Sequence, residues 1–182
     1  MERGLILSGF GGQGLLFAGQ ILAQAAVLEG RHVSWLPSYG PEMRGGSAAC
    51  TVIVSERPIG SPVLDRADVV IALNPPALAK YIGLLAPGGL LVLNESLIEA
   101  EPGRTDIDTV RVRASALART IGDERFISII ALGAALGRRP IVAPASLRHA
   151  IEEVGKGGRA VTDANLRAFE LGIEAAGVPV RG

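Results

Sequence analysis

Residues that bind metals or form disulfides are scarce in this sequence. Its 182 residues include one cysteine, Cys50, and two histidines, His32 and His149. A single cysteine excludes an intrachain disulfide, an iron–sulfur cluster held by this chain alone and a thiolate zinc site. Two separated histidines supply too few ligands for a His-rich metal site. Because Cys50 lies within a strand pattern, we expect a buried, small apolar side chain rather than a nucleophile.

Aromatic side chains are few, and neither sign of charge is in excess. Aromatics make up 4% of the chain, and 18 basic residues balance 18 acidic ones. Nucleic-acid binding needs massed positive charge, and single strands also need aromatic stacking platforms, so we expect no nucleic-acid partner. No apolar run reaches the ~18–20 residues needed to cross a bilayer, so no membrane contact is expected. The N-terminus does not resemble a signal peptide, which makes the cytoplasm the expected location.

Apolar residues, mainly Ala, Val, Ile and Leu, are abundant at 48% of the chain. Such a composition suits parallel strands that are buried on both faces and covered by helices. We therefore predict an α/β, Rossmann-like fold with a mostly parallel sheet flanked by helices and a helical C-terminal segment. The length fits a single domain over 1–182, with an α/β core over 1–125 and a helical portion over 126–182.

Local patterns place the individual elements of this fold. Strands are predicted over 4–8, 31–36, 48–55, 68–73, 90–94 and 109–112. Helices are predicted over 15–29, from Pro75 to about Ala86, from a cap at Ser115 to Gly122, and over 127–136, 146–154 and 163–176. A turn at Pro87–Gly89 should precede the fifth strand. The short connection between the second and third strands favours an antiparallel pair or a loop that crosses the sheet edge.

A glycine-rich loop between the first strand and the first helix matches G-x-G-x-x-G through Gly9, Gly11 and Gly14. Gly9 permits a tight turn, Gly11 beside Gly12 lets a phosphate or polar group approach the backbone, and Gly14 permits close packing. The first helical turn then offers N–H groups to an anion. The alternative is that these glycines serve packing alone. Gly12 and Gln13 exceed what packing requires, which favours a ligand-facing or partner-facing role.

Classical NAD binding lacks support in this sequence. An acidic residue at the end of the second strand normally holds the ribose. The segment 33–36 reads VSWL and contains no acid.

A second polar loop, Ser38–Ser47, should project from the same carboxyl edge of the sheet, where ligands bind in doubly wound folds. Arg44 could bind a carboxylate or phosphate through its guanidinium, and Glu42 could orient Arg44 or a partner group. The alternative is a solvated loop with an incidental ion pair. The candidate residues of this loop are Tyr39, Gly40, Glu42, Arg44, Gly45, Gly46 and Ser47.

Autonomous catalytic machinery is missing. There is no G-x-x-x-x-G-K-[ST] phosphate loop and no G-x-S-x-G elbow, and neither Ser8 nor Ser38 has an evident base. We therefore expect no catalytic residue in this chain.

Together the two loops, GFGGQG at 9–14 and SYGPEMRGGS at 38–47, closely resemble the gamma subunit of the 2-oxoacid:ferredoxin oxidoreductases. The segments 52–55, Pro58-Ile59 and 165–172 extend the resemblance over nearly the whole chain. One departure is Ile127-Ser128, where many relatives carry an asparagine, and this difference is expected to alter a contact with partner subunits.

The resemblance implies membership of a complex that oxidises a 2-oxoacid with coenzyme A to acyl-CoA and carbon dioxide and reduces ferredoxin. It implies alpha, beta and ferredoxin-like delta partners that carry thiamine diphosphate and iron–sulfur clusters. This chain would support the active-site region and, as in some members, help to hold CoA. The second loop resembles the 2-oxoglutarate and branched-chain branches more than the pyruvate branch. The alternatives are a free-standing Rossmann-type nucleotide-dependent oxidoreductase and a non-catalytic module that binds CoA or another anion.

Overall fold

The computed structural model describes residues 1–40, 46–155 and 157–177. Its strands are Glu2–Phe10 (β1), His32–Tyr39 (β2), Ser47–Ser55 (β3), Ala67–Ala72 (β4), Leu85–Asn94 (β5) and Asp108–Val112 (β6). Its helices are Leu15–Leu28 (α1), Pro75–Tyr81 (α2), Ala114–Ile121 (α3), Ile127–Arg138 (α4), Pro144–Val154 (α5) and Arg159–Ala176 (α6). Two short 3₁₀ turns are Ile82–Leu84 (η1) and Glu124–Phe126 (η2).

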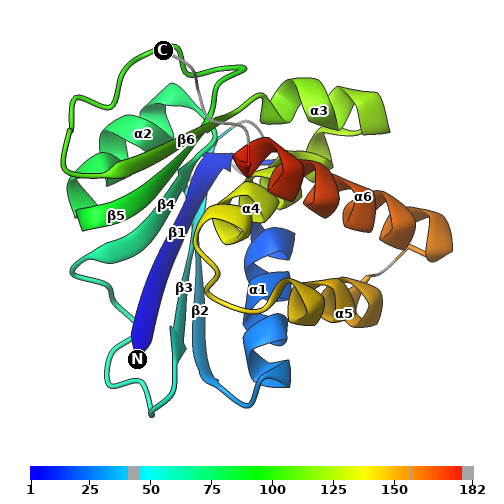
Figure 1. The fold of residues 1–182 in the computed structure, drawn as a ribbon, viewed down its shortest axis with the longest axis horizontal. Helices are drawn as coiled ribbons and strands as arrows, with labels where there is room; N and C mark the ends of the chain where they lie inside the picture. Colours follow the sequence, from blue (N-terminus) through cyan, green and yellow to red (C-terminus); the bar gives the residue numbers. More distant parts are fainter. Residues whose placement is uncertain (41–45, 156, 178–182) are drawn as a thin grey trace.

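The six strands form one sheet in the order β2-β3-β1-β4-β5-β6. β1, β4, β5 and β6 are parallel neighbours, whereas β3 runs antiparallel to both β1 and β2. The predicted mostly parallel, Rossmann-like sheet is therefore confirmed, and the second and third strands form an antiparallel hairpin (Figure 1). The chain leaves β1 toward the hairpin side and leaves β4 toward β5. The strand order thus reverses between β1 and β4, which is where doubly wound folds bind ligands at the carboxyl edge.

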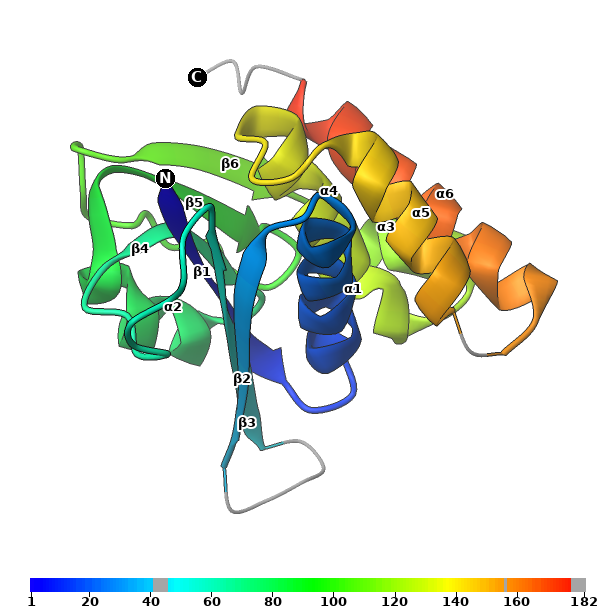
Figure 2. The same cartoon turned by 90° about the horizontal axis from the view of Figure 1, so that it is seen from below.

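Helices cover the two faces of the sheet unequally (Figure 2). α1 and α4 lie directly on one face, and α5 and α6 pack outside them, whereas α2 lies on the opposite face. Alternation along β1 supplies both cores, since Leu5 and Leu7 join the α1 and α4 side and Ile6 joins the α2 side. α4 is apolar and buried along most of its length because the sheet lies on one side of it and α6 on the other. None of the helices in the described ranges is long and apolar enough to cross a bilayer.

Glycines permit the close crossing of α4 and α6. A Cβ at Gly172 would overlap the carbonyl oxygen of Ile130, and a Cβ at Gly133 would overlap the carbonyl oxygen of Phe169. The two helix backbones therefore approach closely only because both positions lack a side chain.

Several predicted boundaries were wrong for reasons that lie outside the local sequence. α2 ends at Tyr81 rather than near Ala86, and β5 begins at Leu85. The turn expected at Pro87–Gly89 does not precede the strand but interrupts it, because the β4–β5 pairing jumps from Leu85 to Leu90.

The first residue of α3 is Ala114, so Ser115 does not cap that helix. Asn94, at the end of β5, takes this part instead. Its side-chain oxygen accepts a bond from the Ser115 N–H at 3.2 Å, and its amide donates to the Ser115 Oγ at 2.9 Å. These buried bonds tie the end of β5 to the start of α3, a connection that a local sequence pattern does not reveal.

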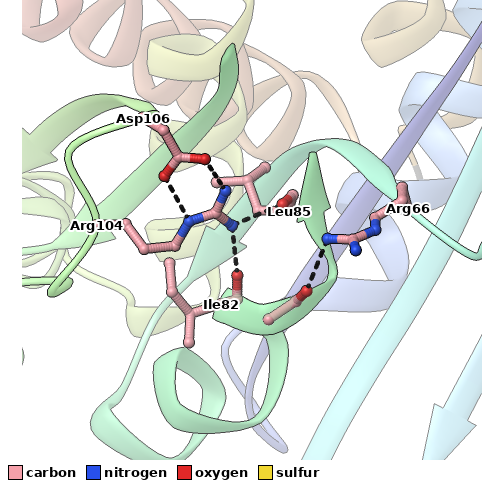
Figure 3. Close-up of polar contacts among 6 residues, drawn as sticks. Arg66, Ile82, Leu85, Arg104 and Asp106 are labelled. Carbon is pink, nitrogen blue, oxygen red and sulfur yellow. Dashed lines mark hydrogen bonds and ion pairs between the residues drawn. The ribbon is translucent and has the colours of Figure 1, made fainter. Parts of the chain in front are cut away.

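An arginine clamp holds the turn between α2 and β5 (Figure 3). The Arg104 guanidinium donates to the carbonyl oxygens of Ile82 at 3.1 Å and Leu85 at 2.6 Å. The same guanidinium pairs with Asp106 through two bonds of 2.8 and 2.5 Å, which lowers the pKa of that carboxyl. Arg66 donates to the carbonyl oxygen of Gly83 at 3.4 Å. The loop before β6 is thereby fastened to the end of α2.

We predict that Gly172→Ala lowers the free energy of unfolding by about 2 kcal/mol or more, because its methyl group would force α4 and α6 apart. Chemical denaturation monitored by circular dichroism would measure the loss. Gly60→Ala is the matched control, because a Cβ at Gly60 meets nothing within 4 Å. Equal stability of the two variants would contradict the close helix crossing.

Candidate functional site

The two glycine-rich loops meet at the carboxyl edge of the sheet. β1 and β2 run in the same direction because each is antiparallel to β3. The Gly11 N–H donates to the Gly46 carbonyl oxygen at 2.9 Å, and the Gly40 N–H donates to the Ser47 carbonyl oxygen at 2.8 Å. The structure therefore brings the first loop and the hairpin end into direct contact. Glu42, Arg44 and Gly45, which the sequence placed in the second loop, lie outside the described residues.

The glycines of the first loop differ in what they do. Gly9 is the second-to-last residue of β1, and a Cβ there would overlap the Gln13 Oε1. Gly12 has φ +97°, and a Cβ there would meet nothing within 4 Å. This exposed backbone therefore lies open to a ligand or partner. Gly14 has φ +78°, and a Cβ there would overlap the Arg125 carbonyl oxygen and lie 2.9 Å from the Ser128 Oγ. Packing accounts for Gly9 and Gly14, whereas no described atom lies within 4 Å of where a Gly12 side chain would be.

Gln13 turns inward rather than toward a ligand. Its Oε1 accepts a bond from the Phe10 N–H at 2.8 Å, and its backbone oxygen accepts from the Ser128 N–H at 3.3 Å. The residue is 7% exposed. Gln13 therefore shapes the loop and joins it to α4, and this placement favours a structural role.

Ser128 is fully buried beneath the first loop. Its Oγ has no hydrogen-bond partner among the described residues. The Ile127-Ser128 departure, expected to alter a partner contact, therefore lies in the interior of this chain at the joint between Gly14 and α4.

An open hollow of about 320 Å³ lies in front of the first turn of α1. It is lined by Phe10, Gly11, Gly12, Gly14, Leu15, Leu16, Phe17, Tyr39, Ala48 and Arg125. Gly14 caps α1 with no side-chain bond, so the N–H groups of the first turn face this hollow with the positive end of the helix dipole. Phe10 and Tyr39 are 38% and 56% exposed. The hollow thus combines an anion-attracting helix end with an apolar rim.

A second hollow of about 260 Å³ continues from the first. The two share Gly14, Phe17 and Arg125, and the second is completed by Phe126, Val161 and Asn165. We call the two together the loop groove. Its described lining is largely apolar and includes one cation, Arg125.

Arg125 is held at the groove by Asp123. Its Nε donates to the Asp123 Oδ2 at 2.8 Å, and its backbone N–H donates to the Asp123 Oδ1 at the same distance. These bonds lower the pKa of the Asp123 carboxyl. The sequence reasoning missed Arg125, Phe17 and Asn165, because they reach the groove from three separate helical segments and no local motif joins them.

Metal chemistry has no support in the described ranges 1–40, 46–155 and 157–177, where no three His, Cys, Asp or Glu side chains gather to hold an ion. Cys50 is fully buried, as expected, and its Sγ lies 3.4 Å from the Leu15 carbonyl oxygen. Burial raises the pKa of the Cys50 thiol to about 12. His149 is on the surface of α5, where its Nε2 lies 3.2 Å from the Glu153 carboxylate.

Comparison with known proteins identifies a single family over nearly the whole chain. The sequence profile described as "Pyruvate ferredoxin/flavodoxin oxidoreductase" matches residues 4–175. "Ketoisovalerate oxidoreductase subunit VorA" from Methanothermobacter thermautotrophicus is 39% identical over 97% of this chain. This chain spans only 37% of that relative's length.

Two solved structures share the fold and are similar in sequence. The gamma subunit of a keto/oxoacid ferredoxin oxidoreductase from Geobacter sulfurreducens PCA has a TM-score of 0.81 and 31% identity, covering 96% of this chain and 98% of that one. A 2-oxoglutarate:ferredoxin oxidoreductase from Magnetococcus marinus, with 2-oxoglutarate, coenzyme A and succinyl-CoA bound, has a TM-score of 0.85 and 25% identity. The match covers 96% of this chain and 31% of that one.

We predict that Gly14→Ala unfolds at a distinctly lower temperature than Gly12→Ala. Both changes strain a positive φ, at about 1 kcal/mol each, but only the methyl group at residue 14 also overlaps the Arg125 carbonyl oxygen in η2 and crowds Ser128 in α4. Differential scanning calorimetry of both variants measures the difference. A Gly14→Ala chain as stable as Gly12→Ala would show that the Gly14–Arg125 contact does not constrain the loop.

We predict that Cys50 in the folded chain resists iodoacetamide at pH 8, because a thiol with a pKa of about 12 contains almost no thiolate there. Mass spectrometry would detect alkylation only after guanidinium is added, which exposes the thiol and returns its pKa to the ordinary range. Rapid labelling without denaturant would contradict the buried position.

Proposed function

Because this chain belongs to the pyruvate ferredoxin/flavodoxin oxidoreductase family, we propose that it serves as the gamma subunit of a 2-oxoacid:ferredoxin oxidoreductase complex. The complex would oxidatively decarboxylate a 2-oxoacid with CoA, giving acyl-CoA, carbon dioxide and reduced ferredoxin. The observation that carries the proposal is the match of 96% of this chain to 98% of a solved gamma subunit, at 31% identity.

The catalytic groups of such a complex would be held by other subunits. An iron–sulfur cluster needs several thiolates, and the one cysteine here is buried and protonated. The described residues therefore do not fit a cluster. We accordingly propose that alpha, beta and ferredoxin-like delta subunits carry thiamine diphosphate and the clusters, and that ferredoxin is reached through them.

The role of this chain would be to support the active-site region and to contribute to CoA binding. The loop groove supplies what an extended anionic ligand requires. Gly12 and the first turn of α1 present N–H groups to a phosphate, and Arg125 would pair with a second charge. Phe17 and Phe126 offer apolar surface for the uncharged part of the ligand. The bound CoA in the Magnetococcus marinus enzyme is consistent with this assignment.

The substrate favoured is 2-oxoglutarate or a branched-chain 2-oxoacid. The ketoisovalerate relative and the 2-oxoglutarate structure each support one of the two. The cytoplasmic location stays a prediction.

The other two hypotheses are less well supported. A free-standing nucleotide-dependent oxidoreductase would need an acid at the end of β2, and His32–Tyr39 reads HVSWLPSY. A stand-alone CoA-binding module would use the same groove, but it leaves the whole-chain similarity to a complex subunit unexplained.

We predict that Arg125→Ala raises the KM for CoA about three- to tenfold when the variant is produced in the source cell and purified within its complex. The KM for the 2-oxoacid should not change, because the lost cation would contact CoA alone. The measurement is viologen reduction with 2-oxoglutarate or ketoisovalerate as substrate, with CoA varied.

Arg57→Ala removes an exposed charge at the opposite edge of the sheet and should leave both constants unchanged. An unchanged KM for CoA in Arg125→Ala would exclude Arg125 from the CoA site. Recovery of the wild-type chain as a lone monomer, under anaerobic conditions at low salt, would contradict the subunit proposal itself.

A further inference from the structure

The hairpin leaves part of one sheet face open on the side away from α1. α2 lies over this face of β1 and β4, whereas the hairpin strands β2 and β3 extend beyond it (Figure 2). Near the carboxyl edge, this open face carries small polar side chains instead of apolar core residues.

Strand register gathers these side chains in one row. Ser8 on β1 pairs with Ala49 on β3, and Ala49 pairs with Ser38 on β2. The three therefore lie side by side on one face of the sheet, and Ser47, two residues before Ala49, lies on the same face. The Ala49 methyl group thus lies among the hydroxyl groups of Ser8, Ser38 and Ser47.

α2 places a cation, the Lys80 ammonium, beside this row of serines. Lys80 and Tyr81 line the same hollow as the three serines, and the hollow has a volume of about 60 Å³. The Lys80 ammonium lies 5.1 Å from the centre of the Tyr81 ring, a cation–π contact that holds the charge beside the hollow. We call this site the hydroxyl pocket, formed by Ser8, Ser38, Ser47, Ala49, Lys80 and Tyr81.

The donors of the hydroxyl pocket suit an anion. The Ser8 hydroxyl donates to the Ala48 carbonyl oxygen at 3.2 Å, so its hydrogen is already used. Ser38 and Ser47 are exposed and each carries a hydroxyl donor. A Cβ at Gly40 would lie only 2.9 Å from the Ser47 Oγ, so the glycine leaves this hydroxyl room. No carboxylate of the described residues lies within ion-pair distance of Lys80.

We propose that the hydroxyl pocket binds a single oxyanion, a carboxylate or phosphoryl group, through the Lys80 ammonium and the hydroxyls of Ser38 and Ser47. Its volume holds a few water molecules or one such group but excludes a whole nucleotide. The site lies on the opposite face of the sheet from α1 and the loop groove, and it does not depend on the proposed subunit role.

The test is a titration of the full-length, ¹⁵N-labelled chain with inorganic phosphate and, separately, with acetate, at constant ionic strength. We expect saturable shifts of the amide signals of Ser38, Gly40, Ser47 and Ala49 at millimolar anion. Tighter binding of phosphate would identify a phosphoryl group as the ligand, and tighter binding of acetate would identify a carboxylate.

Variants at Lys80 tie the shifts to the hydroxyl pocket. Lys80→Ala should weaken binding at least about fivefold, whereas Lys80→Arg keeps the charge and should stay within about twofold of the wild type. Arg57→Ala, which removes a charge from the other edge of the sheet, should bind as the wild type does. Lys80 is exposed, so these variants should fold, and Lys80→Gln provides a second neutral variant.

Two results would overturn the proposal. One is the lack of saturable shifts at these four amides with either anion. The other is binding that Lys80→Ala and Lys80→Gln leave unchanged, or that Arg57→Ala weakens equally. Because the isolated chain is titrated, neither result bears on whether the chain assembles into an oxidoreductase complex.

Discussion

The backbone contact between Gly14 and the start of α4 is the constraint on which the site depends. Gly14 lies so close to the Arg125 carbonyl oxygen and Ser128 that no side chain fits between them. The Gln13 carbonyl oxygen accepts the Ser128 N–H, which fastens the same joint with a hydrogen bond. As a result, the start of α1 lies against the start of α4.

This joint creates the loop groove. The turn before α4 brings Arg125 and Phe126 beside the first turn of α1, and α6 adds Val161 and Asn165. The close α4–α6 crossing at Gly133 and Gly172 keeps α6 near enough to contribute. The helical C-terminal segment therefore completes the candidate site as well as covering the sheet. A substitution that disturbs the α4–α6 packing should also change the shape of the loop groove.

Much of the fold could be predicted from local pattern, because buried strands and amphipathic helices carry their periodicity in the sequence. Composition and pattern predicted the mostly parallel sheet, and the short second connection left an antiparallel pair as one of two alternatives, which the structure decided in favour of the hairpin. The failures have a common cause. Pro87–Gly89 interrupts β5 because pairing with β4 overrides the local turn preference. Asn94 rather than Ser115 bonds the start of α3 because a contact between residues 21 positions apart overrides the local cap preference. Gln13 faces inward, where its Oε1 accepts the Phe10 N–H.

The sequence by itself determined the α/β class, the two glycine-rich loops at one sheet edge and the resemblance to oxidoreductase gamma subunits. These properties depend on composition, spacing and motif, which the linear chain contains. Only the tertiary structure decided that Arg125 lies beside the first turn of α1 and that Lys80 lies over Ser38 and Ser47. Both juxtapositions join residues at least thirty positions apart. They arise from strand register and helix crossing, which become fixed only when the whole core packs.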